Sequence, residues 1–223
     1  METRDLWSWE FAWRVLPDLL AGLVVTLEAV AAGMAVALVL GMVWAVMRRS
    51  ASPLLSWPAA GLVEFLRSTP LLIQLFFLYY VLPGVGIFMP PLLTGVIGLG
   101  LYYSSYTAEV YRAGINGLPR GQWEASLALN LNGWQTYRYV ILPQAIPPVL
   151  PALGNYLIAM FKDTPLLSAI TVLEVLQRAK NIGNAEFRYL EPLTLVGLLY
   201  LVLSLICGAG VNWLENRLKK RKA

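Results

Sequence analysis

A series of long apolar runs restricts the fold of this 223-residue chain more than any other feature. The first run covers about residues 19–47 and is interrupted only by Thr26 and Glu28. A helix needs about 20 apolar residues to cross the hydrocarbon core of a bilayer, so this run is long enough. Four more runs cover about residues 54–82, 91–110, 140–175 and 192–214. Together they predict an all-α protein, a polytopic transmembrane helix bundle with five spans.

Positive charge indicates how the spans are oriented, because Lys and Arg accumulate in cytoplasmic loops. Arg48 and Arg49 follow the first run, a basic tail follows the fifth, and three more arginines lie between the third and fourth runs: Arg112, Arg120 and Arg138. With five spans these places share one side, which predicts an external N-terminus and a cytoplasmic C-terminus. The expected parts are an external segment at 1–18, a single membrane domain at 19–216 with a cytoplasmic loop at about 113–139, and the basic tail at 217–223.

Residue usage excludes several functions. The chain has no histidine, so neither Ser-His catalysis nor a histidine-ligated metal site is available. Its one cysteine, Cys207, cannot form an internal disulfide. No Gly-Lys pair occurs, which excludes a Walker A phosphate loop, and the basic residues flank apolar runs instead of forming a nucleic-acid surface. We therefore expect a transport subunit rather than an enzyme, with no metal, cofactor or nucleic acid. Any ATP must be bound by another chain.

The loop at about 113–139 carries the most specific motif of the chain. Glu124-Ala125-Ser126 is followed by Asn130, a residue that tolerates the left-handed turn with which a short helix can end. The spacing resembles the EAA loop of ABC importer permeases, with Ser126 at its third position and Asn130 at the position of a glycine. The residues assigned to this loop and its continuation are Gly121, Glu124, Ala125, Ser126, Asn130, Leu142 and Pro143.

The resemblance covers nearly the whole chain from about residue 20. Residues 64–74, 109–114 and 161–168 look like the signatures of the polar amino acid, or histidine-glutamine-type, subfamily. Ectoine and hydroxyectoine permeases are taken as its closer relatives, although no residue separates ectoine from other zwitterions. The resemblance implies a type I ABC importer permease fold, a cytoplasmic coupling helix and a place in the bacterial inner membrane. The implied partners are two ATP-binding cassette subunits, a second permease subunit (identical or paralogous), a periplasmic substrate-binding protein and a small zwitterionic solute such as a polar amino acid.

Polar residues inside the second run suggest a lining for the solute path. On one continuous helix, Glu64, Arg67 and Gln74 would share an arc of about 80°. Such a stripe should face the bundle interior and not lipid. Glu64 and Arg67 are three residues apart and can pair, so bracing of neighbouring helices is an equally open role for them. Gln74 is the better candidate for contact with the solute.

Charged residues also occur deep in the fourth run, where Lys162-Asp163-Thr164 precedes Pro165. If the helix enters lipid near residues 148–151, Lys162 lies about 16–21 Å further on, past the middle of the hydrocarbon core. Broken helices at that depth often form transport sites. Lys162 and Asp163 can therefore meet the carboxylate and the ammonium of a zwitterion, with Thr164 beside them. The alternative is that the two charges brace neighbouring helices.

Two other groups of residues in the spans are given no role in solute binding. Glu28 is not assigned to the polar core. The tyrosines of the third run are interpreted as packing or interface aromatics rather than a cation-binding cage: Tyr102, Tyr103 and Tyr106.

The main alternative function is a self-sufficient secondary transporter or channel. The commonest transporter architectures use paired internal repeats, and none is evident here. The motif of the 113–139 loop would also have no purpose in such a protein. A membrane enzyme lacks a nucleophile motif or metal cluster in this sequence, and an assembly factor would not need charges inside the spans.

Overall fold

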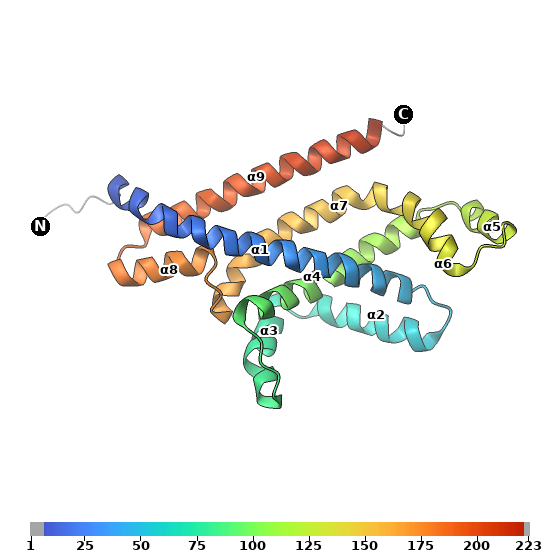
Figure 1. The fold of residues 1–223 in the computed structure, drawn as a ribbon, viewed down its shortest axis with the longest axis horizontal. Helices are drawn as coiled ribbons and strands as arrows, with labels where there is room; N and C mark the ends of the chain where they lie inside the picture. Colours follow the sequence, from blue (N-terminus) through green and yellow to red (C-terminus); the bar gives the residue numbers. More distant parts are fainter. Residues whose placement is uncertain (1–6, 221–223) are drawn as a thin grey trace, which may run out of the picture.

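The computed structural model describes residues 7–220, and every regular element in that range is a helix. Helix α1 (Trp9–Met47) has 39 residues and runs most of the length of the molecule (Figure 1). It begins well before the apolar run because Ser8 is extended and accepts a hydrogen bond of 3.3 Å from the Phe11 N–H. The expected boundary at residue 18 is therefore inside a helix, and residues 1–6 of the N-terminal segment lie outside the described range.

Helix α4 (Pro91–Asn116) packs along α1 and forms the central pair of the bundle with it (Figure 1). The two backbones approach closely because small residues lie between them. The Thr107 hydroxyl donates a 2.7 Å hydrogen bond to the Ala37 carbonyl. A Cβ atom at Gly41 would lie only 2.0 Å from Thr107 Oγ1. Close packing of small residues is a main source of helix association in lipid, where burial of apolar surface contributes little.

The second apolar run does not form one helix, so the expected continuous helix with a single polar stripe is wrong. Helix α2 (Pro53–Ser68) is followed by α3 (Leu71–Phe76), the π-helical turn η1 (Phe77–Val81) and the 3-10 turn η2 (Leu82–Val85), with a bend of 105° after α2. Pro70 lacks a backbone N–H and disfavours helical geometry at Thr69, which is extended with ψ 136°. Figure 1 shows α3 leaving the bundle steeply.

Helix α7 (Leu142–Asp163) ends where the sequence predicts a break. The 3-10 turn η4 (Thr164–Ile170) replaces it at once, because Pro165 in the first turn cannot continue the ladder of backbone hydrogen bonds. The chain then passes Thr171, whose φ is 64°, and turns away by 47° into α8. The prediction of a helix broken at Pro165 is confirmed.

Helix α8 (Val175–Glu186) follows the end of the fourth apolar run. It begins because the Glu174 carboxylate accepts hydrogen bonds from the N–H groups of Leu176 and Gln177, at 2.8 and 2.7 Å. The last helix, α9 (Leu190–Lys220), runs back along the bundle, and residues 221–223 of the basic tail lie outside the described range.

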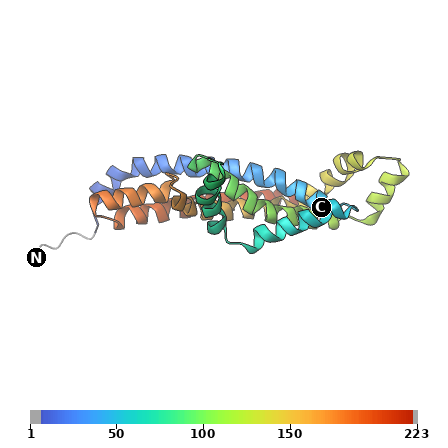
Figure 2. The ribbon, with the colours of Figure 1, turned by 90° about the horizontal axis from the view of Figure 1, so that it is seen from below.

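Two short helices cap one end of the molecule. Helices α5 (Arg120–Ala128) and α6 (Gly133–Gln135) lead through the π-helical turn η3 (Thr136–Ile141) into α7. Figures 1 and 2 both place α5 and α6 at the end of the molecule opposite the start of α1. A capping box starts α6: the Asn132 side chain accepts from the Gln135 N–H, and the Gln135 side chain accepts from the Asn132 N–H, each at 3.0 Å.

Not every helix is both long enough and apolar enough to cross a membrane by itself. Within residues 7–220, two are by themselves long and apolar enough to cross a membrane, Trp9–Met47 and Leu190–Leu218. The number rises to four if each of the two bent helix pairs is counted as one span. Helix α4 has 26 residues but carries several tyrosines, serines and Glu109, which lower its mean hydropathy. The fold is thus a helical membrane bundle with broken elements.

Candidate functional site

Helices α4 and α7 present an incompletely covered face along their seam. On α4 this face lies within an arc of about 80° and consists of Tyr102, Tyr106, Glu109, Ala113 and Gly117, all half-buried or exposed. On α7 an arc of about 40° holds Gln144, Pro148, Asn155 and Lys162, all exposed. A polar face of this kind is unfavourable against lipid, so it needs protein or water opposite it.

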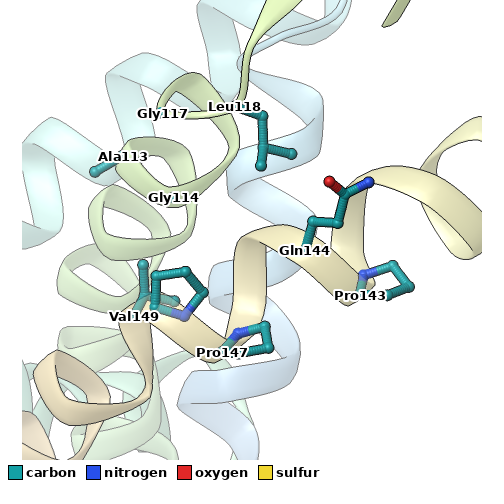
Figure 3. Close-up of a pocket in the computed structure, with 9 residues that line it drawn as sticks. Ala113, Gly114, Gly117, Leu118, Pro143, Gln144, Pro147 and Val149 are labelled. Carbon is teal, nitrogen blue, oxygen red and sulfur yellow. The ribbon is translucent and has the colours of Figure 1, made fainter. Parts of the chain in front are cut away.

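A hollow of about 720 Å³ lies on this face, near the end that carries α5. Figure 3 shows Gly114 and Gly117 of α4 facing Pro143 and Pro147 of α7 across it, with Gln144 at its edge. The Gln144 amide donates a 2.9 Å hydrogen bond to the side-chain oxygen of Gln122 in α5. The hollow therefore lies directly beside the loop with the EAA-like motif.

Asp163 lies deeper along the same seam. The Tyr103 hydroxyl of α4 donates a hydrogen bond of 2.7 Å to Asp163 Oδ2. Lys162 is exposed and points to a different side of α7, since adjacent residues of a helix are about 100° apart. Within residues 7–220 neither side chain forms an ion pair, so mutual bracing does not occur in the isolated subunit.

Thr164 is buried at the break and belongs to a hydrogen-bonded chain that sequence reasoning missed. Its hydroxyl donates to the Phe161 carbonyl at 2.7 Å and lies 2.9 Å from the Tyr200 hydroxyl of α9. Tyr200 in turn donates to Glu174 Oε2 at 3.2 Å. Glu174 is fully buried and caps α8. The break after Asp163 is thereby connected to both α8 and α9. In the sequence, the only signal for this chain is Glu174, an acidic residue of the kind that often precedes a helix.

The other intramembrane candidates do not gather at Asp163. Gln74 donates to the carbonyls of Leu66 and Thr69, at 2.8 and 3.2 Å, and to the Thr69 hydroxyl at 2.7 Å. It therefore satisfies the backbone at the break between α2 and α3. Glu64 accepts from Ser68 at 3.2 Å and does not pair with Arg67. Glu28 is exposed on α1.

Arg67 instead joins a cluster around Glu109, which sequence reasoning also missed. Arg67 lies 3.5 Å from Glu109 Oε1, and Arg112 donates to Oε2 at 2.9 and 2.6 Å. Arg48, at the end of α1, also contacts the Glu109 carboxylate. One half-buried acid thus links α1, α2 and α4. In the sequence, only the three-residue spacing of Glu109 and Arg112 indicates an ion pair. Arg48 and Arg67 lie far from Glu109 along the chain, so no local pattern predicts their contacts.

The loop with the EAA-like motif forms the short helix that the sequence predicts, although α5 starts at Arg120 and not at Glu124. Asn130 has φ 54° and ends it in a Schellman motif. The Leu131 N–H donates to the Ser126 carbonyl at 3.0 Å, and the Asn130 N–H donates to the Leu127 carbonyl at 2.9 Å. Asn130 thus adopts the left-handed backbone conformation that the glycine of the EAA motif would provide.

The surface of α5 is divided between a buried and an exposed side. Ser126 is buried, and its hydroxyl donates to the Gln122 carbonyl at 2.8 Å. Gly121, Glu124 and Ala125 are exposed, and so is Leu127, at 75% of its maximal area. Leu142 and Pro143 begin α7 directly after the π-helical turn. The exposed side offers small and apolar groups to a protein partner.

The chain resembles known transport proteins along its whole length. A family model described as the inner membrane component of binding-protein-dependent transport systems matches residues 37–220. The "probable amino-acid ABC transporter permease protein y4tG" of Sinorhizobium fredii is 52% identical over 211 residues, which cover 95% of this chain and 91% of that protein. The glutamine transport system permease protein GlnP of Escherichia coli is 33% identical over 214 residues, covering 95% and 98%.

Solved structures agree with this result. A chain from the crystal structure of an amino acid ABC transporter with histidines superposes with a TM-score of 0.86 at 32% identity, covering 95% of this chain and 99% of that one. A chain of the MetNI methionine ABC transporter, in an inward-facing conformation, gives 0.65 at 20% identity over 93% and 99% of the two chains, which shows a shared fold.

The fold and these relatives define the membrane-spanning permease subunit of an ABC importer. More particularly, the chain belongs to the family of binding-protein-dependent transport system inner membrane components. Membership confirms that the chain is a transport subunit rather than an enzyme and that its partners are a separate ATPase and a binding protein. It also removes the alternative of a self-sufficient secondary transporter or channel. The relatives named here are amino-acid and glutamine permeases, so the ectoine assignment stays a prediction.

Proposed function

We propose that this chain, together with a second permease chain, forms the path of an amino acid or a similar zwitterion across the inner membrane. One observation carries the proposal: Lys162 and Asp163 end α7 at a helix break, on different sides of that helix, and within residues 7–218 neither charge has a counter-ion. A zwitterion supplies both opposite charges. The amino-acid names of the relatives support the same solute class.

A second permease chain, identical or paralogous, would cover the open face of α4 and α7. Two ATPase subunits would then bind on the side of α5, one to each permease chain, and a periplasmic binding protein would deliver the solute from the other side. Burial supports this arrangement, because the polar face formed by both helices would otherwise meet lipid.

The proposed topology has five spans: α1, the bent unit of α2 and α3, α4, α7 and α9. The N-terminus and α8 would be periplasmic, and α5 and the C-terminus cytoplasmic. The arginines at the α5 end of the bundle support this orientation. In a Cys207→Ser background, single cysteines at positions 122 and 184 test it by labelling in intact cells with a membrane-impermeant maleimide. Position 184 should react, and labelling at 122 would contradict the orientation.

In this arrangement α5 is the coupling helix that contacts the ATPase. Glu124→Arg and Ala125→Asp place bulk or an unpaired charge in the contact and should abolish transport-linked ATP hydrolysis, while the protein stays in the membrane. Gly61→Ala in α2 is the control, because it lies outside the loop and a Cβ atom at that position meets nothing within 4 Å. Normal uptake of solute by both charged variants would refute the coupling role.

Neutralisation of the two charges tests the solute path. Lys162→Met and Asp163→Asn should each reduce uptake by at least about tenfold in complexes that still assemble and hydrolyse ATP, since each removes one charge partner of the zwitterion. Loss of a structural ion pair would instead lower complex yield, and the exchange Lys162→Asp with Asp163→Lys would restore it. Uptake at the wild-type rate and affinity by either assembled single variant would sink the assignment.

A further inference from the structure

Four tyrosines of α4 and α7 pack together, and the hydroxyl of one of them, Tyr103, bonds to the carboxylate of Asp163. The Tyr103 ring lies at the centre of the group, with centroids of the other rings 5.4 Å (Tyr102), 6.0 Å (Tyr106) and 6.4 Å (Tyr156) away. Tyr106 also lies 5.2 Å from Tyr102 and 5.4 Å from Tyr156. Tyr156 and Asp163 are seven residues apart on α7 and therefore share one side of that helix. Helices α4 and α7 thus converge on one aromatic cluster with a carboxylate at its edge.

The cluster is only partly buried. Tyr103 is 3% exposed and holds Asp163, whereas the other three rings are half-buried and belong to the open face of the seam or its border. The hydroxyls of Tyr102 and Tyr106 lie 3.0 Å apart and bond to each other. One of these hydroxyls donates to the other, and the ring faces remain available to a cation of the solute.

Asp163 has acceptor capacity that this subunit does not use. Tyr103 donates to Oδ2, and among residues 7–220 no Lys or Arg nitrogen lies within 4.0 Å of the carboxylate. A carboxylate at membrane depth is stabilised chiefly by a cation and by hydrogen-bond donors. Ring faces carry negative electrostatic potential, so they attract the same kind of group. The cluster and the carboxylate both favour a nitrogen cation.

We propose that Tyr102, Tyr106, Tyr156 and Asp163 form an aromatic box for the cationic nitrogen of the transported solute. This inference rests on the proposed function and assigns the two ends of the zwitterion: the ammonium enters the box, and the carboxylate lies towards Lys162. The proposal gives Tyr102 and Tyr106 a role beyond the packing that the sequence predicts for them. It also defines the solute class, because a molecule without a cationic nitrogen gains nothing from these groups.

The test measures binding to the purified complex of permease and ATPase subunits, without the binding protein, so that only the permease site contributes. The probes are L-glutamine, L-asparagine and L-serine, and their N-acetyl derivatives, which lack the ammonium charge and carry no other cation. The variants are Tyr106→Leu and Tyr156→Leu, with Tyr106→Phe and Tyr156→Phe to keep the ring. Tyr189→Leu, between α8 and α9, is the control for loss of an exposed tyrosine. Complex yield and basal ATP hydrolysis report on folding.

The wild type should bind at least one parent amino acid about tenfold or more tighter than its N-acetyl derivative. Each Leu variant should weaken binding of the parent by about tenfold and leave the derivative within about twofold, because only the cation interacts with the ring. The Phe and Tyr189→Leu variants should stay close to wild type. Equal weakening of parent and derivative, or no weakening, would overturn the box and leave the proposed function standing. Failure of all three parents to bind the intact wild-type complex would overturn the proposed function and the box with it.

Discussion

The hydroxyl of Tyr103 donates a 2.7 Å hydrogen bond to Oδ2 of Asp163, which lies 60 residues further along the chain. Tyr103 is buried between α1 and α7, so its hydroxyl has a fixed position. The bond therefore sets the direction of the carboxylate at the point where α7 ends. This relationship makes Tyr103 a positioning residue for the proposed solute site.

Tyr103→Phe should lower uptake by about tenfold. A hydrogen bond to a charged group contributes about 1.5–3 kcal/mol, and without it the Asp163 carboxylate is no longer held in the orientation that binds the solute. Uptake into proteoliposomes with the binding protein is the measurement, and complex yield should stay normal. Tyr111→Phe is the matched control: it is buried on the same helix, and no hydrogen bond of its hydroxyl is found within residues 7–220. Equal effects of both substitutions would show that packing, and not the bond, matters.

Glu109→Gln should destabilise the end of the bundle that carries the coupling loop. The change leaves Arg48, Arg67 and Arg112 without their shared carboxylate, and the loss of charged hydrogen bonds costs about 1–3 kcal/mol. The thermal midpoint of the purified complex should fall by several degrees. Glu186→Gln breaks the exposed 3.3 Å pair with Arg14 and should change the midpoint little. Similar midpoints for the two variants would contradict the linking role of Glu109.

Asn130→Val should weaken coupling, since a β-branched residue strongly disfavours the φ of 54° found there. The left-handed conformation should cost valine about 1–2 kcal/mol. Opening of the Schellman motif relieves this strain, so the C-terminal end of α5 should fray. ATP hydrolysis stimulated by the loaded binding protein should therefore fall, with unchanged membrane insertion. Asn130→Gly keeps the left-handed turn and should behave as wild type. A functional Val variant would show that the turn is not needed for contact with the ATPase.

Gly41→Ala and Gly61→Ala should have opposite effects on stability. At Gly41 the added methyl group would lie 2.0 Å from Thr107 Oγ1, so α1 and α4 must separate, at about 1–3 kcal/mol. At Gly61, in α2, a Cβ atom meets nothing within 4 Å, and alanine should stabilise the helix by about 0.5–1 kcal/mol. Thermal midpoints of the two purified variants check the sign of each change.

Local chemistry allowed several features to be predicted without coordinates. The apolar runs predicted a helical membrane bundle, and comparison with solved importers confirms that class of fold. Pro165 predicted the break after Asp163, and the spacing around Asn130 predicted a short helix that ends in a left-handed turn. Each of these depends on a property carried by one stretch of chain: length in lipid, a missing N–H, or a tolerated backbone angle.

Other features depended on contacts between distant segments, and only the tertiary structure decided them. The second run was expected to form one helix, but it bends by 105° after α2, and Gln74 satisfies the carbonyls that the break exposes. Arg67 was expected to pair with Glu64, its neighbour on the helix, but α4 brings Glu109 within reach. Tyr103 was interpreted as a packing residue, and the packing of α4 against α7 also brings its hydroxyl to Asp163. The sequence by itself determined the helical membrane class and the break after Asp163, since those are local effects, whereas the bend after α2 and the partner of each polar group depend on how the helices pack against one another.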